Sequence, residues 1–393
     1  MKKILMIAAL AATVCMARAQ LTMQQALEAV EAHNSSLKAI YEGLEAQKLQ
    51  NRTGLNLPNP EVEFAYLWGS PDGIPNRKDV SVSQSFDMAT LLGYKRRVAL
   101  QENQLLELQY RKERMNLLLE AKETLVNLVY YNALWQQAHL RLQAAMQLDS
   151  AYQKKFNAGE AGVIETGKIH LSIALLTAQI EQVQVERAAL LGKLQQLAGG
   201  TPLSFEATEY EEQGVLPSQF DEWYAAASQH SPLLAYVQHD VEASRARVAL
   251  SRAQGLPSLK AGYTSELIKD DNYRGVSVGL TIPLWENKNR VKQARAAALA
   301  AESRMEDARI TFYTSLLTQY NRVQGLQASA ARLTEALGGA HTMTLLTKAL
   351  EGGKLSLLDY LQESDFYYQA AGSALEAQRD YQLALARLQA VEL

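Results

Sequence analysis

Residues 276–282 read VSVGLTI, and residues 80–86 read VSVSQSF. In both stretches apolar side chains alternate with small or polar ones, which is typical of a β-strand with one apolar face. Residues 61–68 (EVEFAYLW) follow the same alternation, and residues 259–264 (LKAGYT) follow it more weakly. Segments of about ten residues with this pattern predict either a half-buried sheet of a soluble protein or a transmembrane β-barrel.

The strands are part of a plan that occurs twice in the chain. Leu57-Pro58 recurs as Leu256-Pro257, and residues 159–165 (GEAGVIE) are echoed by residues 353–359 (GKLSLLD). A repeat offset of nearly half the chain predicts one structural unit used twice. The two repeats are expected at residues 20–198 and 217–393, with a connecting segment at residues 199–216.

Each repeat also contains a long stretch without proline that has the periodicity of a helix. From about Leu91 to Phe156 apolar residues recur every three or four positions, and residues 288–350 are the counterpart in the second repeat. About 60 helical residues make a rod of roughly 90 Å, which is too long for a compact domain. We therefore predict a mainly α chain with a small β part, in the order helix, two strands, very long helix, turn and helix.

Residues 1–19 have the features of a secretory signal peptide. Lys2 and Lys3 precede an apolar run, and Ala17-Arg18-Ala19 matches a cleavage site. The only cysteine, Cys15, lies in this segment, and the residues before it do not form a lipidation motif. The mature chain is therefore expected to have no disulfide and no thiolate site. An export signal together with long helices favours the barrel over the soluble sheet.

Charge and motif content argue against several other classes. The chain has 39 Lys and Arg against 42 Asp and Glu, whereas a nucleic-acid partner requires a surplus of cations. We find no nucleophile elbow, zinc-protease motif, phosphate loop or dinucleotide fingerprint, so we expect no enzyme and no cofactor. The six histidines show no metal-ligand spacing, so no metal site is expected.

In this order and in duplicate, the motifs resemble those of the TolC family of outer-membrane efflux and secretion channels. The resemblance covers essentially the whole mature chain. It is carried by Leu57-Pro58-Asn59-Pro60-Glu61, by residues 82–86 leading into Lys95-Arg96-Arg97, by residues 279–285 leading into Asn289-Arg290, and by the two turns at 159–165 and 353–359. The asparagine and proline before the first strand look most like the CzcC/CusC-like heavy-metal branch.

The resemblance implies a homotrimer in the outer membrane of a Gram-negative bacterium that extends into the periplasm. Each chain would give four strands to a twelve-stranded barrel and its helices to a periplasmic tunnel. Four strands are too few to close a barrel, so a barrel of this kind requires several chains. The implied partners are a periplasmic adaptor (membrane fusion) protein, an inner-membrane RND-type pump and outer-membrane lipid, with no nucleic acid.

The resemblance also implies a constriction at the periplasmic tip, where acidic residues follow the helix turns. The tip turns are expected at Gly159 and Gly353. Asp359 matches the first acidic position, Gln362 stands where a second acid is expected, and Glu165 is the equivalent of Asp359 in the first repeat. Three carboxylates around one axis would repel one another and attract cations. The alternative for Asp359 is an ordinary helix N-terminal acid.

Two further groups of residues allow more than one interpretation. Four aromatic residues near strand ends are candidates for membrane-interface girdles or for core packing: Tyr66, Trp68, Tyr94 and Trp285. Two basic clusters follow the second strand of each repeat and could face lipid headgroups or form a solvated helix face: Lys95-Arg96-Arg97 and Lys288, Arg290 and Lys292.

The function expected from these features is the exit duct of a tripartite efflux pump, conducting passively through a gate at the periplasmic tip. The exported substrate would be heavy-metal cations or small toxic compounds. One alternative is an exit channel for type I secretion. Another is a non-conducting periplasmic coiled-coil tether, which would not need alternating strands.

Overall fold

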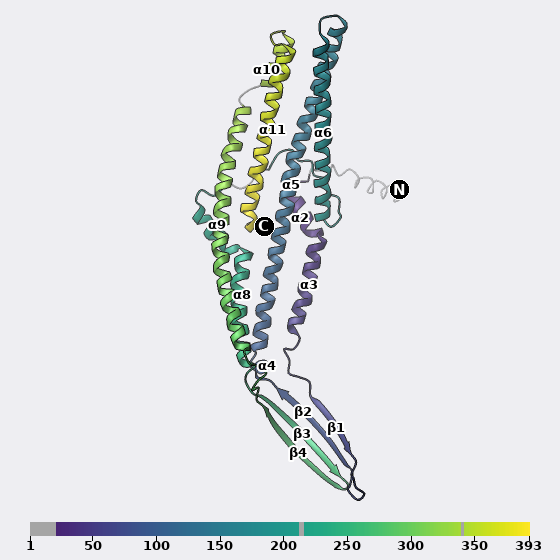
Figure 1. The fold of residues 1–393 in the computed structure, drawn as a ribbon, viewed down its shortest axis with the longest axis vertical. Helices are drawn as coiled ribbons and strands as arrows, with labels where there is room; N and C mark the ends of the chain where they lie inside the picture. Colours follow the sequence, from purple (N-terminus) through teal and green to yellow (C-terminus); the bar gives the residue numbers. More distant parts are fainter. Residues whose placement is uncertain (1–20, 212–215, 339–341) are drawn as a thin grey trace, which may run out of the picture. The chain divides into compact units, whose positions relative to one another are not determined.

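The computed structural model describes residues 21–211, 216–338 and 342–393 (Figure 1). The expected signal peptide at residues 1–19 lies outside these ranges. The described chain is mainly helical with one small sheet, which confirms the predicted fold class. Helices, two strands, a long helix and further helices follow one another in each half, as the duplicated plan predicts.

The elements have the following bounds. The first half contains α2 (Met23–His33), α3 (Ser35–Arg52), β1 (Glu61–Leu67), β2 (Arg77–Phe86), α4 (Met88–Leu91), α5 (Tyr94–Asn157) and α6 (Val163–Leu197). The second half contains α7 (Phe220–His230), α8 (Pro232–Ala253), β3 (Ser258–Ile268), β4 (Asp271–Thr281), α9 (Arg290–Gly338), α10 (Thr342–Glu351), α11 (Leu357–Leu388) and the 3-10 helix η1 (Gln389–Glu392).

Two helix boundaries differ from the sequence-based expectation. The first long helix begins at Tyr94 because Gly93, with a φ of +72°, separates it from the short helix α4. Residues 288–350 were expected to be one helix, but they contain both α9 and α10. The sequence has two consecutive glycines at 338 and 339, and glycine disfavours helix continuation. Residues 339–341 lie outside the described ranges.

The chain forms two compact units, and neither coincides with a sequence repeat. The helical unit comprises Met1–Lys38, Arg114–Tyr224 and Ser315–Leu393. The sheet unit comprises Ala39–Glu113 and Ala225–Thr314, and so contains all four strands. Each unit therefore combines segments of both repeats.

The sheet has the strand order β1-β2-β3-β4, and every neighbouring pair is antiparallel. Strands β1 and β4 are its two edges. Strand β3, which has the weaker alternation, spans 11 residues and pairs along its length with both neighbours. The central pair joins the two repeats, because Val82 of the first lies opposite Tyr263 of the second.

One face of the sheet is mainly apolar and exposed, although the register also places Gln84, Ser265 and Arg274 on it. The register places Val62, Val82, Tyr263 and Val276 in one row across the four strands, and directly paired residues share a face. We call the apolar face the following nine side chains, which are 40% to 85% exposed: Val62, Phe64, Val80, Val82, Leu259, Tyr263, Val276, Val278 and Leu280. A contiguous apolar surface of this kind requires a partner or a lipid environment.

The opposite face of the sheet is polar and carries ion pairs. Arg77 forms ion pairs with Asp79 at 2.7 Å and with Glu266 at 3.1 Å. Across the strands, Lys260 pairs with Glu61 at 2.7 Å. These pairs lie on residues that alternate with the apolar face, so the two faces of one sheet have opposite chemistry.

The core of the helical unit lies where α2, α5 and α6 meet the connecting segment. Four successive apolar positions of α5 are at most 1% exposed: Leu125, Val126, Leu128 and Val129. Phe205 of the connecting segment is 2% exposed and packs in the same cluster. Asn34 donates a hydrogen bond to the backbone oxygen of Leu197 at 2.7 Å, which fixes the end of α6 against the start of α3.

Part of the connecting segment is bound to α5 and is not a free linker. The Asn132 amide on α5 donates to the backbone oxygens of Phe205 at 3.3 Å and Ala207 at 3.0 Å. The Arg187 guanidinium on α6 donates to the Asn132 carbonyl oxygen at 2.7 Å. Tyr210 donates to the backbone oxygen of Val126 at 3.2 Å, and burial raises the pKa of this phenol far above its usual value.

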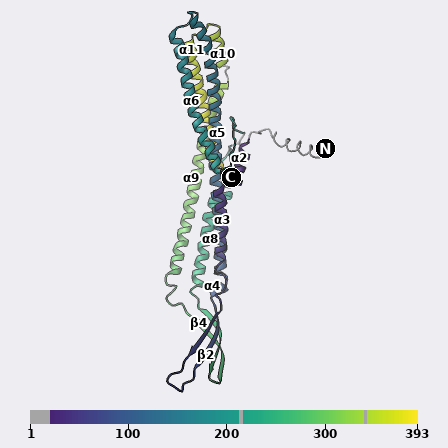
Figure 2. The same cartoon turned by 90° about the vertical axis from the view of Figure 1, so that its right-hand side faces the viewer.

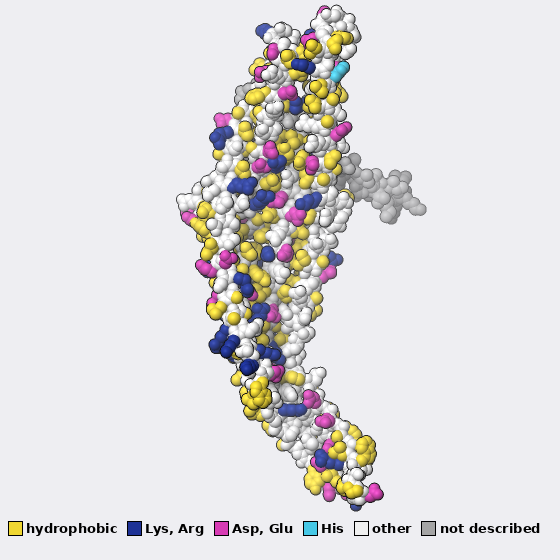
Figure 3. All heavy atoms as spheres, viewed as in Figure 1, with side chains coloured by type: hydrophobic (Ala, Val, Ile, Leu, Met, Phe, Trp, Pro, Cys, Tyr) yellow, Lys and Arg dark blue, Asp and Glu magenta, His cyan; other side chains and the backbone are white. Residues whose placement is uncertain are grey.

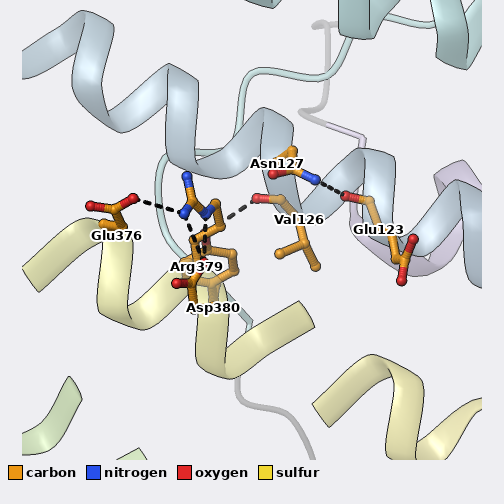
Figure 4. Close-up of polar contacts among 7 residues, drawn as sticks. Glu123, Val126, Asn127, Glu376, Arg379 and Asp380 are labelled. Carbon is orange, nitrogen blue, oxygen red and sulfur yellow. Dashed lines mark hydrogen bonds and ion pairs between the residues drawn. The ribbon is translucent and has the colours of Figure 1, made fainter. Parts of the chain in front are cut away.

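Helix α11 is fixed to α5 close to this point (Figure 4). Arg379 binds the carboxylates of Asp380 at 2.8 Å and Glu376 at 3.0 Å, as the close-up shows. The same guanidinium lies 4.5 Å from the ring centre of Tyr130 on α5. Figure 4 also shows the backbone oxygen of Val126, which accepts the hydrogen bond from Tyr210. The Arg379 guanidinium and Tyr210 of the connecting segment therefore both contact this part of α5.

Among the described residues, no helix combines the length and the apolar composition that a membrane crossing requires.

The close approach at the end of α6 leads to a first prediction. Gly199 has a φ of +63°, and an added Cβ would overlap the backbone oxygen of His33. Gly200 also has a positive φ, +89°, but no heavy atom lies within 4 Å of a Cβ placed there. We expect Gly199→Ala to lower the free energy of unfolding by about 2–4 kcal/mol and Gly200→Ala by about 1 kcal/mol. Thermal unfolding followed by circular dichroism measures both, and equal losses would contradict the close contact.

Candidate functional site

The turn between α5 and α6 ends the first long helix with a left-handed glycine. Gly159 has a φ of +77°, and its N–H donates to the Phe156 oxygen at 3.0 Å. The next N–H, of Glu160, donates to the Lys155 oxygen at 2.8 Å. These two hydrogen bonds form a Schellman motif, which requires a residue that tolerates positive φ.

The turn between α10 and α11 repeats this geometry. Gly353 has a φ of +68°, and its N–H donates to the Leu350 oxygen at 3.1 Å. The Lys354 N–H donates to the Ala349 oxygen at 2.8 Å. The structure therefore places both glycines that the sequence singles out in equivalent helix-ending turns.

Glu165 and Asp359 lie in the first turn of the helices that follow. Glu165 accepts a hydrogen bond from the N–H of Gly162 at 2.6 Å. Asp359 accepts the Ser356 hydroxyl at 2.6 Å, and the Asp359 N–H donates to the same hydroxyl oxygen at 3.2 Å. Both acids therefore stabilise a helix N-terminus within a single chain. Within residues 21–211, 216–338 and 342–393, neither carboxylate forms an ion pair with Lys or Arg.

The two turns lie at the same end of the helical unit, as the two views show (Figures 1 and 2). They are joined by a small apolar cluster of Tyr152 on α5, Ile169 on α6 and Leu357 on α11, which are 1% to 8% exposed. Burial raises the pKa of Tyr152, and the nearby Glu165 charge raises it further. The packing of the three helices therefore brings the Glu165 turn and the Asp359 turn together.

Gln362 lies one helical turn after Asp359, is exposed, and lines a groove between α6 and α11 with a volume of about 500 Å³. Two exposed leucines of α6, Leu171 and Leu175, line the opposite side. Apolar side chains in an exposed groove at the end of a helix bundle are typical of a surface that contacts another protein.

Sequence reasoning missed the charged cluster in this groove. Arg141 on α5 forms an ion pair with Asp365 on α11 at 2.8 Å, and its guanidinium lies 4.2 Å from the ring centre of Tyr368. Burial raises the pKa of the Tyr368 phenol, although the Arg141 charge opposes this. Since 224 residues separate Arg141 and Asp365 in the chain, no local pattern could have paired them.

Two of the four aromatic candidates lie at the β1–β2 hairpin end of the sheet. The rings of Tyr66 and Trp68 meet edge to face with centres 5.3 Å apart. Asn76, on the other arm of the hairpin, donates to the Tyr66 hydroxyl at 2.8 Å. Trp68 is 79% exposed, so its indole is not packed in a core of this chain.

The other two aromatic candidates lie at the helix end of the sheet. Tyr94 begins α5 and is half-buried, whereas Trp285, four residues after β4, is 80% exposed. The four aromatic residues are thus divided between the two ends of the sheet, which is the arrangement that two interface girdles need.

Of the basic triplet that follows β2, only Lys95 forms an ion pair with the residues that the structure describes. Lys95 forms an ion pair with Asp87 at 3.1 Å, and Thr90 donates to the same carboxylate at 2.6 Å. Burial raises the pKa of Asp87, but the hydrogen bonds from Thr90 and Lys95 outweigh it and lower the pKa overall. Arg96 and Arg97 are exposed.

Within the part of the chain that the structure describes, no three His, Cys, Asp or Glu side chains are grouped so that they could bind a metal ion.

Residues 223–391 match the model of a protein family described as outer membrane efflux protein. The matched region covers most of the second repeat, including β3, β4 and the α10–α11 turn. No curated protein sequence matches the chain significantly.

The fold is similar to that of solved outer-membrane channels. A CusC structure superposes with a TM-score of 0.78 at 15% identity and covers 95% of this chain and 92% of its own. The VceC protein of Vibrio cholerae gives a TM-score of 0.72 at 17% identity, with coverages of 94% and 95%. The open-state MtrE channel of Neisseria gonorrhoeae gives 0.71 at 16% identity, with coverages of 95% and 89%. The chain therefore has the TolC-like fold of outer-membrane efflux channels.

Proposed function

We propose that the chain is the outer-membrane exit channel of a tripartite efflux pump and acts as a homotrimer. The match of residues 223–391 to outer membrane efflux proteins and the shared fold support this proposal. The observation on which it depends most is the sheet, which has an exposed apolar face, a polar opposite face and two open edges. A periplasmic tether would require none of these features.

In a closed barrel, the backbone N–H and C=O groups at the two sheet edges find hydrogen-bond partners. In water or lipid, an open edge leaves a row of backbone N–H and C=O groups without partners. If β4 of one chain pairs with β1 of the next, three chains with four strands each close the sheet. The apolar face then contacts lipid and the polar face lines the lumen. Strands β3 and β4, with 11 residues each, span about 25 Å when they are tilted by about 45°.

We further propose that the ends of the helices form a constriction in which Asp359 is the main acidic ring, with Glu165 and Gln362 beside it. Around a threefold axis the Asp359 carboxylates would repel one another and attract cations. The absence of a Lys or Arg partner among the described residues leaves this charge free to act on a passing ion. The channel itself conducts passively and carries out no chemistry.

The remaining parts of the proposal concern partners and substrate. A periplasmic adaptor protein and an inner-membrane RND-type pump supply the substrate and the energy, and the channel lies in the outer membrane of a Gram-negative bacterium. The proposed substrates are heavy-metal cations or small toxic compounds. Since CusC, VceC and MtrE give similar TM-scores, the heavy-metal assignment depends on the sequence motif before β1 and needs its own test.

Engineered cysteines test the barrel. Cys15 is the only cysteine and lies in the expected signal peptide, so new cysteines are the only reactive thiols of the mature chain. We expect Val62→Cys on β1, combined in turn with Val276→Cys, Val278→Cys or Leu280→Cys on β4, to give covalent trimers on non-reducing gels for at least one pair.

Within one chain β1 and β4 are separated by about 14 Å, so these bonds can form only between chains. Val82→Cys on β2 with the same β4 partners is the matched control, because β2 and β4 are never neighbours in the proposed barrel. Monomers alone from all three β1–β4 combinations would argue against a shared barrel.

Single-channel recording tests the constriction. Asp359→Asn and Asp359→Ala should both raise conductance and weaken block by divalent cations about tenfold, which corresponds to about 1.4 kcal/mol of lost binding. Ser356→Ala is the control, because it removes the hydroxyl that binds Asp359 but keeps the carboxylate charge. If block is unchanged in the Asp359 variants, or is lost equally in Ser356→Ala, the acidic ring is elsewhere.

Growth of a deletion strain tests the substrate. Across salts of Cu, Zn, Co and Cd, bile acids and dyes, we expect sensitivity confined to the metals, with the minimal inhibitory concentration lowered at least fourfold. Complementation with the wild-type chain should restore growth. Sensitivity to bile acids and dyes instead would replace the heavy-metal assignment with a general drug and detergent efflux channel.

A further inference from the structure

Two long helices, α5 and α9, begin in the sheet unit, and the first turn of each is positively charged, whereas a helix N-terminus in water favours negative charge. Helix α5 begins at Tyr94 and α9 at Arg290, and neither has an acidic residue in its first turn. Both first turns are instead basic, with Lys95, Arg96 and Arg97 in α5 and Lys292 in α9. Since a helix N-terminus has a partial positive charge, these cations destabilise the helix unless an anion lies nearby.

Most of these cations have no anion within the chain. We call the basic belt the following five residues, which are exposed: Arg96, Arg97, Lys288, Lys292 and Arg295. None of them forms an ion pair or a side-chain hydrogen bond with the residues that the structure describes. Farther along the helices of the same unit, cations are paired, as Arg247 is with Glu102 at 3.1 Å and Arg304 with Asp240 at 2.9 Å.

Exposed apolar side chains separate the basic belt from the strands. Leu91 and Leu92 precede α5, and Leu284 and Trp285 precede α9; these four side chains are 50% to 80% exposed. Figure 3 shows the arrangement on one face, where dark blue Lys and Arg side chains gather at the ends of α8 and α9 and yellow apolar side chains lie next to them toward the sheet. From the strands toward the starts of α5 and α9, the surface therefore has three successive zones. The apolar face comes first, the exposed leucines and Trp285 follow, and the basic belt comes last.

A lipid leaflet has the same order of chemistry, from acyl chains through the interfacial zone to phosphate. Leucine and tryptophan side chains favour the interfacial zone, and Lys and Arg beyond them reach the headgroup phosphates. Arginine can bind a phosphate through two parallel N–H groups. A soluble acidic partner would explain the cations but not the exposed leucines and Trp285 between them and the lipid-facing strands.

We propose that the basic belt binds anionic phospholipid headgroups in the leaflet that faces the helices, with phosphatidylglycerol as the model headgroup. This inference rests on the proposed function, because it requires the apolar face to lie in a bilayer. The bound phosphates supply the negative charge that the first turns of α5 and α9 lack, and so fix the depth at which the sheet sits in the membrane. We therefore expect anionic lipid to stabilise the trimer against dissociation, and salt to weaken this stabilisation.

Nanodiscs of defined composition test the proposal. The thermal midpoint of trimer dissociation is measured in phosphatidylcholine alone and with 30% phosphatidylglycerol. We expect the wild type to gain several degrees from phosphatidylglycerol and to lose most of this gain in 0.5 M NaCl. The variant R96Q/R97Q/K292Q/R295Q should show no gain.

The matched control is K154Q/R309Q/R322Q/K354Q, which neutralises four exposed cations outside the basic belt and should gain as the wild type does. Inorganic phosphate added to phosphatidylcholine discs should not reproduce the gain. The inference is wrong if the basic-belt variant gains as much as the wild type, if the wild type gains nothing, or if free phosphate suffices.

Failure of the channel proposal would look different. Trimer formation and conductance in phosphatidylcholine alone test the proposed function without involving the basic belt. If both are present and the phosphatidylglycerol effect is absent, only the lipid inference fails. If no trimer forms in either lipid, the proposed function fails.

Discussion

The constraint on which the structure depends is that its sheet is incomplete. Four strands expose an apolar face on one side and a row of unpaired backbone groups at each edge, and no other segment described in this chain covers that face. In the proposed trimer, neighbouring chains pair with the two edges and lipid covers the apolar face. The polar face, with its Arg77 and Lys260 ion pairs, then lies where water can reach it.

In the helical unit, specific contacts end the long helices and fix them to one another. Gly159 and Gly353 end two helices with the same pair of backbone hydrogen bonds. At the start of the following helices, Glu165 accepts the N–H of Gly162, and the Ser356 hydroxyl accepts the N–H of Asp359. Arg379 and Asn132 then attach α11 and the connecting segment to α5 through buried or half-buried polar contacts. All of these contacts lie within the helical unit of a single chain. A constriction around a threefold axis, in contrast, would require three chains.

The fold class, the order of elements and the turns at Gly159 and Gly353 could be predicted from the sequence, because they depend on short-range signals: alternation, three- and four-residue spacing, and glycine where φ must be positive. The separation of α9 from α10 was missed because the absence of proline from residues 288–350 was taken to mean one continuous helix, whereas α9 ends at Gly338. The pairing of Arg141 with Asp365 could not be predicted, since it depends on how α5 and α11 pack and not on any neighbouring residue. The sequence predicts two repeats along the chain, and the compact units of the structure each combine segments of both repeats.

This interleaving has a kinetic consequence. The β2–β3 ladder joins residues 77–86 to residues 258–268, so the centre of the sheet forms only after most of the chain has been synthesised. The nearest paired residues of this ladder, Phe86 and Leu259, are 173 positions apart (259 − 86), and closing so long a loop is slow compared with forming a hairpin. Until then the β1–β2 hairpin exists alone, with Val62, Phe64 and Val82 exposed and both of its edges open. Folding of this chain therefore passes through an aggregation-prone hairpin, and a chaperone that binds the hairpin is the simplest way to protect it.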